Sequence, residues 1–334
     1  MPGRPPADSD DEPEEGPEYM LGFLDDPERP TDLLRHRFPS KVGGAPAWLD
    51  PLNLPTPAQL TCGVSGEALR FLLQVYCPAS GCPVEAFHRT LFLFISPRGD
   101  ELAKPGAVRA LRCQLRRANA FYGDAPAPEG QAAPVPLGAA EAALARERDP
   151  WRVVDAEAAI AGGAAVADAA AAAAGGVPLF AEQELVVEPE PSEDGDDGDD
   201  EEGQGGAGAR RGEVARLLAA YNARAFQART ALAPEQCLRY CFQPGAAPLW
   251  PSHECVPAPG DIPPCPHCGA ARRFEFQVMP QLLSLMELDP GDPHAPDWGT
   301  IAVYSCPASC TPPPVEGPRG PSAYVEEFVW VQPS

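Results

Sequence analysis

The sequence contains one pattern twice, and this repetition limits the folds that are open to the chain. The segment CGVSGEALRFLLQVY, which begins at Cys62, aligns without a gap with CPHCGAARRFEFQVM, which begins at Cys265. The aligned pairs with identical residues include Gly66 with Gly269, Phe71 with Phe274, Gln74 with Gln277 and Val75 with Val278. Farther along, RTLFLFISP from Arg89 aligns in the same way with GTIAVYSCP from Gly299. We predict two copies of one supersecondary unit that form pseudo-symmetric halves.

The rest of the chain divides around these copies. Residues 1–17 are acidic and rich in proline, so we expect them to be disordered. Residues 18–123 and 213–334 carry strand-like alternation and turn signals, and they are the predicted N-terminal and C-terminal halves. Residues 124–212 are dominated first by alanine and glycine and then by acidic residues. We predict a long disordered linker there, because this composition offers almost no large apolar face to pack.

β-Strands dominate the predicted secondary structure. In the second copy, Phe274, Phe276 and Val278 alternate with polar residues, which is the period-two pattern of a strand with one wet face. The segments TIAVYS and EEFVWVQ predict two further strands, and PQLLSLMEL predicts a short helix. The predicted fold class is therefore α+β and mostly β: an internally duplicated β-rich domain with a disordered linker between its halves.

The net charge of the chain indicates which class of molecule it binds. The chain has 48 acidic and 25 basic residues, which gives a formal net charge of −23. Affinity for nucleic acid depends on lysine and arginine, so we expect a basic protein partner and no direct nucleic-acid binding. Because no stretch reaches the length of about 18 apolar residues that a membrane span requires, we expect no membrane partner. We find no secretory signal, and the eleven cysteines indicate thiols and metal ligands in the reducing cytoplasm, with the nucleus as a second location.

Four cysteines of the C-terminal half have the spacing of zinc ligands. Cys265 and Cys268 form a CxxC pair, and Cys306 and Cys310 form a CxxxC pair at the end of the TIAVYS strand. Zinc in structural sites takes four cysteine or histidine ligands in a tetrahedron, and a CxxC turn brings two sulfurs to one ion. We predict one structural zinc ion in the C-terminal half, bound by these four cysteines.

Other interpretations of these cysteines remain open. A thioredoxin-like redox pair would place CxxC at the start of a helix, whereas here it precedes a strand, and buried thiols without a metal are a further alternative. His267 lies inside the CxxC and Cys255 lies just upstream, so either can replace one of the four ligands. If zinc is bound, its loss is expected to unfold the C-terminal half, because zinc-binding energies of about 10–16 kcal/mol rival the stability of a whole domain.

The first copy has a different set of residues at the corresponding positions. They are Cys62, Ser65, Ser96 and Asp100 in place of Cys265, Cys268, Cys306 and Cys310. Serine is a poor zinc ligand, and one thiolate cannot hold a structural zinc ion. We therefore expect the N-terminal half to fold without metal.

Longer phrases in both halves are more specific than the cysteine spacing. In chain order they are FPSKVGGAPAWL, FLLQVYCP, FHRTLFLF, PEQCLRY, CPHCGAARRFEFQVMPQLL, DWGTIAVYSC and EEFVW. Together they resemble the programmed cell death protein 2 family, which implies a duplicated β-rich domain and zinc ligands at the four cysteines of the second copy. Many relatives carry a MYND-type zinc finger between the halves, but residues 114–236 contain no cysteine, so this chain resembles members without that finger. Relatives also carry cysteine pairs in the N-terminal half, where this chain has Ser65 and Ser96.

The resemblance implies a dedicated chaperone. Such a protein binds one basic ribosomal protein of the small subunit as it is synthesised and escorts it into the assembly of that subunit. The alternative is a zinc-binding adaptor that joins regulatory complexes in the nucleus or cytosol. We expect neither an enzyme nor a small-molecule substrate, because the sequence has no phosphate-binding loop, HExxH motif or nucleophile elbow, and the predicted zinc has no open position.

Overall fold

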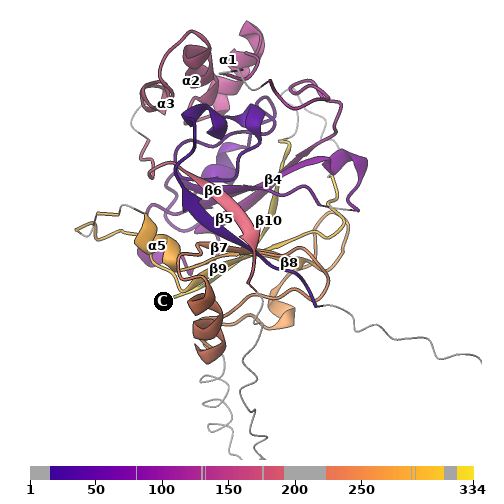
Figure 1. Ribbon diagram of the computed structural model, residues 1–334, viewed down its shortest axis with the longest axis vertical. Helices are drawn as coiled ribbons and strands as arrows, with labels where there is room; N and C mark the ends of the chain where they lie inside the picture. Colours follow the sequence, from indigo (N-terminus) through magenta and orange to yellow (C-terminus); the bar gives the residue numbers. More distant parts are fainter. Residues whose placement is uncertain are drawn as a thin grey trace, which may run out of the picture.

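Ten β-strands close into a barrel, and three helices lie together at one end of it (Figure 1). In this computed structural model the described residues are 16–79, 81–128, 131, 133–174, 177–191, 223–286, 288–289, 291–311 and 322–334. The strands are β1 (Met20–Asp25), β2 (Lys41–Val42), β3 (Arg70–Tyr76), β4 (His88–Ile95), β5 (Val108–Leu115), β6 (Gln183–Pro189), β7 (Leu238–Tyr240), β8 (Arg273–Val278), β9 (Thr300–Ser305) and β10 (Tyr324–Gln332). The prediction of a mostly-β fold is confirmed.

The helices are short and lie between the strands. They are α1 (Ala139–Arg148), α2 (Val153–Ala161), α3 (Val166–Ala174) and α5 (Gln281–Leu285), and a further helix covers residues 223–232. Single turns of 3₁₀ helix occupy the loops at Pro30–Leu33, Arg35–Arg37, Pro57–Leu60, Val84–Ala86, Gly99–Glu101 and Pro259–Asp261. Among the described residues, no helix combines the length and the apolar character that crossing a bilayer demands.

The N-terminal and C-terminal halves share one barrel. Around it the strands follow the order β1-β6-β2-β3-β4-β5-β10-β9-β8-β7, and β7 returns to β1. The first part of β10, Tyr324 to Glu327, pairs with β5, whereas its second part, Phe328 to Gln332, pairs with β9. One long strand thus joins the two halves on one side of the barrel, and β1 joins them on the other.

Two hairpins, one in each half, have the same register. In β3 and β4, Gln74 lies opposite Phe92, and a bulge separates Phe71 from Leu73. In β8 and β9, Gln277 lies opposite Ala302, and a bulge separates Phe274 from Phe276. These are the positions that the sequence alignment makes equivalent, so the aligned segments adopt the same strand geometry.

The core has two layers because the barrel wall is apolar on both faces. All eight residues of β4 are buried. Leu91, Leu93 and Ile95 belong to a cluster that contains residues of both halves, including Trp298. Phe92 and Phe94, the alternate residues, belong to a second cluster with Trp48 and Trp151. A strand that is buried on both faces reads as a continuous apolar run, as LFLFI does here.

Residues 139–174 form helices, and the prediction of a disordered linker is wrong for them. Alanine favours the helices, but a few large side chains dock them: Trp151 is 1% exposed and its ring centroid lies 6.0 Å from that of Trp48. The Asp149 carboxylate accepts the backbone N–H groups of Trp151 (3.1 Å) and Val153 (2.7 Å), which supplies the first turn of α2 with acceptors. Composition averaged over the segment conceals these few anchoring residues.

The predicted linker also contains a strand of the barrel. β6 pairs along its length with β1, so that Leu185 lies opposite Leu24 and Val187 opposite Gly22. Its short apolar run of Leu185, Val186 and Val187 is surrounded by glutamates, and its partner is far away in the sequence. The remaining predicted linker residues 192–212 and residues 1–15 of the predicted acidic terminus lie outside the described residues.

Candidate metal centre

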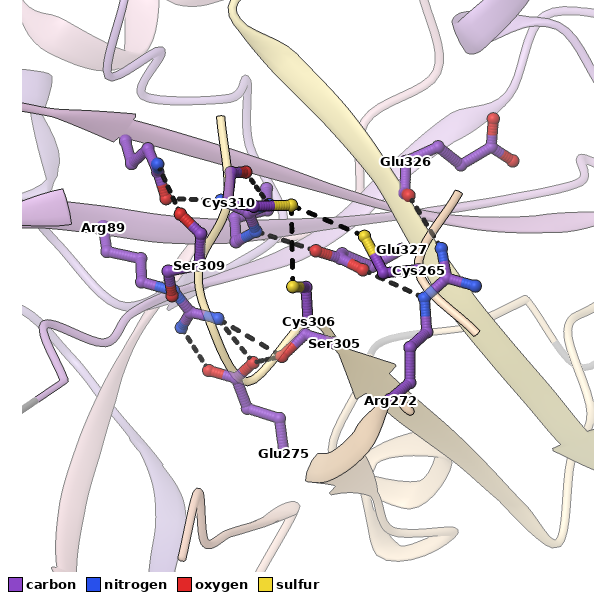
Figure 2. A network of polar contacts seen from close by, with 12 residues as sticks. Arg89, Cys265, Arg272, Glu275, Ser305, Cys306, Ser309, Cys310, Glu326 and Glu327 are labelled. Carbon is purple, nitrogen blue, oxygen red and sulfur yellow. Dashed lines mark hydrogen bonds and ion pairs between the residues drawn. The ribbon is translucent and has the colours of Figure 1, made fainter. Parts of the chain in front are cut away.

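The structure brings the four predicted cysteines together at one end of the β8–β9 hairpin. Figure 2 shows three of them, Cys265, Cys306 and Cys310. Cys265 and Cys268 lie in the turn that precedes β8, and Cys306 directly follows β9. Arg273 at the start of β8 lies opposite Ser305 at the end of β9. Antiparallel pairing therefore places the two cysteine pairs side by side, as the spacing predicted.

The distances between the sulfurs fit a tetrahedral ion. All four Sγ atoms lie within 4.8 Å of one another. Cys265 Sγ is 3.5 Å from Cys310 Sγ, and Cys268 Sγ is 3.5 Å from Cys306 Sγ. Zinc–sulfur bonds of about 2.3 Å place the sulfurs of a tetrahedral site about 3.8 Å apart, whereas a disulfide bond requires about 2.05 Å. The cluster therefore fits a four-thiolate metal site. All eleven cysteines lie among the described residues, and none of them forms a disulfide bond.

The backbone shapes each cysteine pair into a tight turn. Gly269 donates its N–H to the carbonyl of Cys265 (2.9 Å) and has a φ of 74°, a conformation that glycine adopts without strain. Cys265 in turn donates its N–H to the carbonyl of Ala270 (2.9 Å), which closes the loop before β8. On the other side, Ser309 donates to the carbonyl of Cys306 (3.0 Å). These local hydrogen bonds fix the shape of the two turns from which the four cysteine side chains converge.

Burial and hydrogen bonds shift the pKa values of these thiols in opposite directions. Burial raises the pKa of Cys265, but the N–H groups of Cys268 and His267 outweigh it and lower the pKa to about 7. Burial raises the pKa of Cys306 and of Cys310, where the neighbouring thiols raise it further. The Cys265 thiolate is thus favoured without metal, whereas burial opposes loss of the proton from Cys306 and Cys310.

The alternative ligands stay outside the cluster. Among the described residues, the four cysteines are the one group of three or more possible ligands whose donor atoms lie close together. His267 is exposed. Cys255 is also exposed, and its carbonyl accepts the indole N–H of Trp330 (2.7 Å). Neither residue replaces a cysteine in this arrangement.

The N-terminal half holds the loop that carries Cys310. Arg112 of β5 donates one N–H to the carbonyl of Cys310 (2.9 Å) and another to Glu327 (2.8 Å). Gln114, also on β5, donates to the carbonyl of Ser309 (2.8 Å). Arg112 and Glu327 are buried, and Figure 2 shows Glu327 beside the cysteines. The candidate metal centre therefore belongs to the joint between the halves, which sequence reasoning missed.

A buried ion pair lies next to the cluster and also joins the halves. Arg89 of β4 and Glu275 of β8 are both 0% exposed, and Arg89 Nη2 donates to Glu275 Oε2 over 2.8 Å. Ser305, adjacent to Cys306, donates its hydroxyl to the same carboxylate. The Arg89 guanidinium also lies 4.9 Å from the ring centroid of Phe242. In the sequence, a single charge in a strand gives no sign of a partner in the other half.

Comparison with known proteins then identifies the family. Residues 18–129 match the model of the programmed cell death protein 2 N-terminal domain, and residues 221–333 match that of the programmed cell death protein 2 C-terminal putative domain. The mouse protein named programmed cell death protein 2 is 37% identical over 349 residues, which cover 93% of this chain and 95% of the relative. The chain belongs to the programmed cell death protein 2 family.

Other family members extend the comparison. The bovine programmed cell death protein 2 is 36% identical over 346 residues, again across 93% of this chain and 95% of the relative. A fission yeast (Schizosaccharomyces pombe) protein named probable 20S rRNA accumulation protein 4 is 32% identical over 119 residues, which cover 33% of this chain and 28% of the relative. No solved structure matches the chain.

In this family member, the first cysteine turn is built around hydrogen bonds. The turn at Cys62 repeats the backbone geometry of the second: Gly66 donates to the carbonyl of Cys62 (3.0 Å) and has a φ of 74°. The sulfur of Cys62 accepts the N–H groups of Val64 and Ser65, each over 3.4 Å. Burial raises the pKa of this thiol, but hydrogen bonds from Ser65, Ser96 and Val64 lower it overall.

Glu101, and not Asp100, completes the first cluster. Asp100 is exposed, so its predicted correspondence to Cys310 does not extend to a place in the cluster. Glu101 is buried, its Oε2 accepts the hydroxyl of Ser96 (3.2 Å), and the same atom lies 3.9 Å from Cys62 Sγ. One extra residue in the loop brings the carboxylate inward, because Gly99–Glu101 forms a turn of 3₁₀ helix.

Proposed function

We propose that the protein is a dedicated chaperone that binds a basic ribosomal protein of the small subunit as it is synthesised and escorts it into subunit assembly. The observation that carries the proposal is the similarity to the fission yeast relative, whose name refers to the accumulation of an rRNA. The formal net charge of −23 supports it, since an acidic protein attracts a basic client and competes with RNA for its charged segments. The proposed place of action is the cytoplasm, with passage into the nucleus.

Zinc has a structural role in this proposal. The sulfur distances support a tetrahedral ion on Cys265, Cys268, Cys306 and Cys310, and four protein ligands leave no position for a substrate. We propose no catalytic activity for this centre. The common register and bulge of the two hairpins support the further proposal that the halves are copies of one unit, of which one copy binds metal.

Purification of the protein from its own cells under native conditions tests the function. Mass spectrometry is expected to find one small-subunit ribosomal protein in near-equal amount, and metal analysis is expected to find one zinc ion per chain. Enrichment of transcription or signalling proteins without any ribosomal protein would favour the adaptor alternative. A pulse of puromycin before lysis separates capture during synthesis from later binding, because it releases nascent chains from the ribosome.

Restoration of cysteines in the first copy is expected to create a second metal site. The triple variant Ser65→Cys, Ser96→Cys, Glu101→Cys adds three thiols around Cys62, in a turn whose backbone already has the geometry of the metal-binding one. Metal analysis of the purified variant should rise from one to about two zinc ions per chain. A variant with the same three substitutions and Cys62→Ser is the matched control and should return to one ion. An unchanged content in the triple variant contradicts the proposed equivalence.

A further inference from the structure

One edge of β6 is only partly covered. On one side β6 pairs with β1 from Glu184 to Pro189. On the other side β2 pairs with Gln183 and Glu184 alone, and one more hydrogen bond joins the Leu185 N–H to the carbonyl of Ser40 (3.0 Å). Within the described ranges, no strand pairs with residues 186–189 on this second side. Figure 1 shows β6 on the near side of the barrel with β1 beside it.

The backbone of Val187 points to this open side. Successive residues of an antiparallel strand direct their N–H and C=O groups to alternate sides. Leu185 donates toward Ser40, whereas Glu190 donates toward Tyr19, on the β1 side (2.8 Å). By this alternation Val187 directs its N–H and C=O away from β1. Its side chain is 37% exposed, and Glu188 and Pro189 are exposed as well. Such an edge can accept an added strand from a partner.

A hollow lies near the end of the β1–β6 ribbon. Met20, which pairs with Pro189, lines a cavity of about 420 Å³ at the mouth of the barrel. Both halves contribute to its wall, which includes Pro78, Tyr240, Phe242, Arg273 and Pro307. The wall mixes apolar and polar side chains in similar proportion, and Pro307 adjoins Cys306. Within it, Pro78, Phe242 and Pro307 offer apolar contacts to one side chain of a partner that pairs with β6.

The charge around the edge determines the kind of partner. Asp25 lies directly opposite Glu184 on the β1–β6 ribbon, and Glu188 is exposed farther along. Burial, followed by the charges of Asp32, Asp25 and Glu28, raises the pKa of Glu184. Like charges directly opposite one another destabilise a sheet, and the salt bridges found among the described residues include none to Asp25, Glu184 or Glu188. Cationic side chains of a partner would relieve this repulsion.

We propose that the open edge of β6 and the adjoining hollow bind an extended basic segment of a protein partner as an added β-strand. Its backbone pairs with Val187, its basic side chains lie near Glu184 and Glu188, and one apolar side chain enters the hollow. The inference deepens the proposed chaperone function and rests on it for the identity of the client. The binding chemistry itself, a basic strand on an acidic edge, can be measured without the client.

A short synthetic peptide of alternating arginine and valine is the probe, with the full-length protein in the assay. A peptide of the same length with proline in place of valine keeps the charge but cannot form a paired strand. We expect the arginine–valine peptide to bind about tenfold more tightly than the arginine–proline peptide, because it alone makes the backbone hydrogen bonds. Hydrogen exchange should show new protection of the Val187 amide when this peptide is bound. Equal affinity of the two peptides, or protection elsewhere without protection of Val187, would overturn the proposal.

Two substitutions locate the site. Val187→Pro removes the outward N–H but leaves the hydrogen bonds to β1, and Glu188→Lys reverses a charge on the edge. Each is expected to weaken the arginine–valine peptide about tenfold, whereas Glu147→Lys on exposed α1, the matched charge control, should leave its affinity unchanged. If Val187→Pro does not fold, Glu188→Lys and the exchange data decide. If Glu188→Lys and Glu147→Lys lose the same amount of peptide affinity, the binding depends only on overall charge, and the proposed site at the β6 edge is wrong.

The client experiment separates this inference from the proposed function. If wild type and Glu188→Lys retain the ribosomal protein equally in native purification, the function stands and the β6 edge is wrong as its binding site. If the wild type retains no ribosomal protein while the peptide results hold, the edge stands and the proposed client is wrong.

Discussion

Loss of the metal is expected to unfold the whole barrel and not the C-terminal half alone. The apparent energy of a structural zinc site, about 10–16 kcal/mol, exceeds the net stability of most domains, about 5–15 kcal/mol. The loop of Cys310 is held by Arg112 of β5, and β10 pairs with both β5 and β9. A disordered metal loop therefore releases the strand that joins the halves, which revises the expectation from the sequence.

Hydrogen exchange on chelator-treated protein and on a Cys306→Ser variant tests this result. Amides of β4 in the N-terminal half and of β9 in the C-terminal half should lose protection together, by a factor of at least about a thousand, and the circular dichroism of the strands should fall. Cys255→Ser, at an exposed cysteine outside the cluster, is the control and should keep full protection. Protection of β4 that survives metal removal would show that the halves are independent, and a metal-free protein that stays fully protected would refute the metal centre.

Glu275→Gln is expected to destabilise the protein by about 3–5 kcal/mol, because it leaves the charge of Arg89 buried without a counter-charge. Both side chains are 0% exposed, and the pair joins β4 of one half to β8 of the other. Chemical denaturation measured by circular dichroism gives the free energy of unfolding. Glu326→Gln is the matched control: its partner is Arg109, and its side chain is 48% exposed, so a loss within about 1 kcal/mol is expected.

A double variant distinguishes a missing counter-charge from lost packing. Arg89→Met with Glu275→Leu removes both charges and fills a similar volume, so it should recover most of the stability that Glu275→Gln loses. If Glu275→Gln costs no more than Glu326→Gln, the buried pair does not hold the halves together. If the double variant is as unstable as the single one, the polar contacts of Ser305 and Tyr240 with the Glu275 carboxylate matter more than the charge.

Much of the candidate site could be predicted because its determinants are local. The spacing of Cys265 and Cys268 sets a turn, and the alternation of Phe274, Phe276 and Val278 sets the strand that follows it. The errors arose where a few residues outweighed the composition of their segment. Trp151 docks an alanine-rich helical region on Trp48, and Leu185 brings a strand of the acidic segment into the barrel. Neither partner is near in sequence.

The sequence by itself determined the cluster of four cysteines, the two hairpins and the family, since each depends on residue types at short and regular intervals. Only the tertiary structure decided that the halves share one barrel, that Glu101 rather than Asp100 lies beside Cys62, and that Arg89 meets Glu275. Those outcomes depend on which distant strands pair and on how a loop turns. Pairing joins the edges of strands that are far apart in the chain, and no single segment carries the information about its partner.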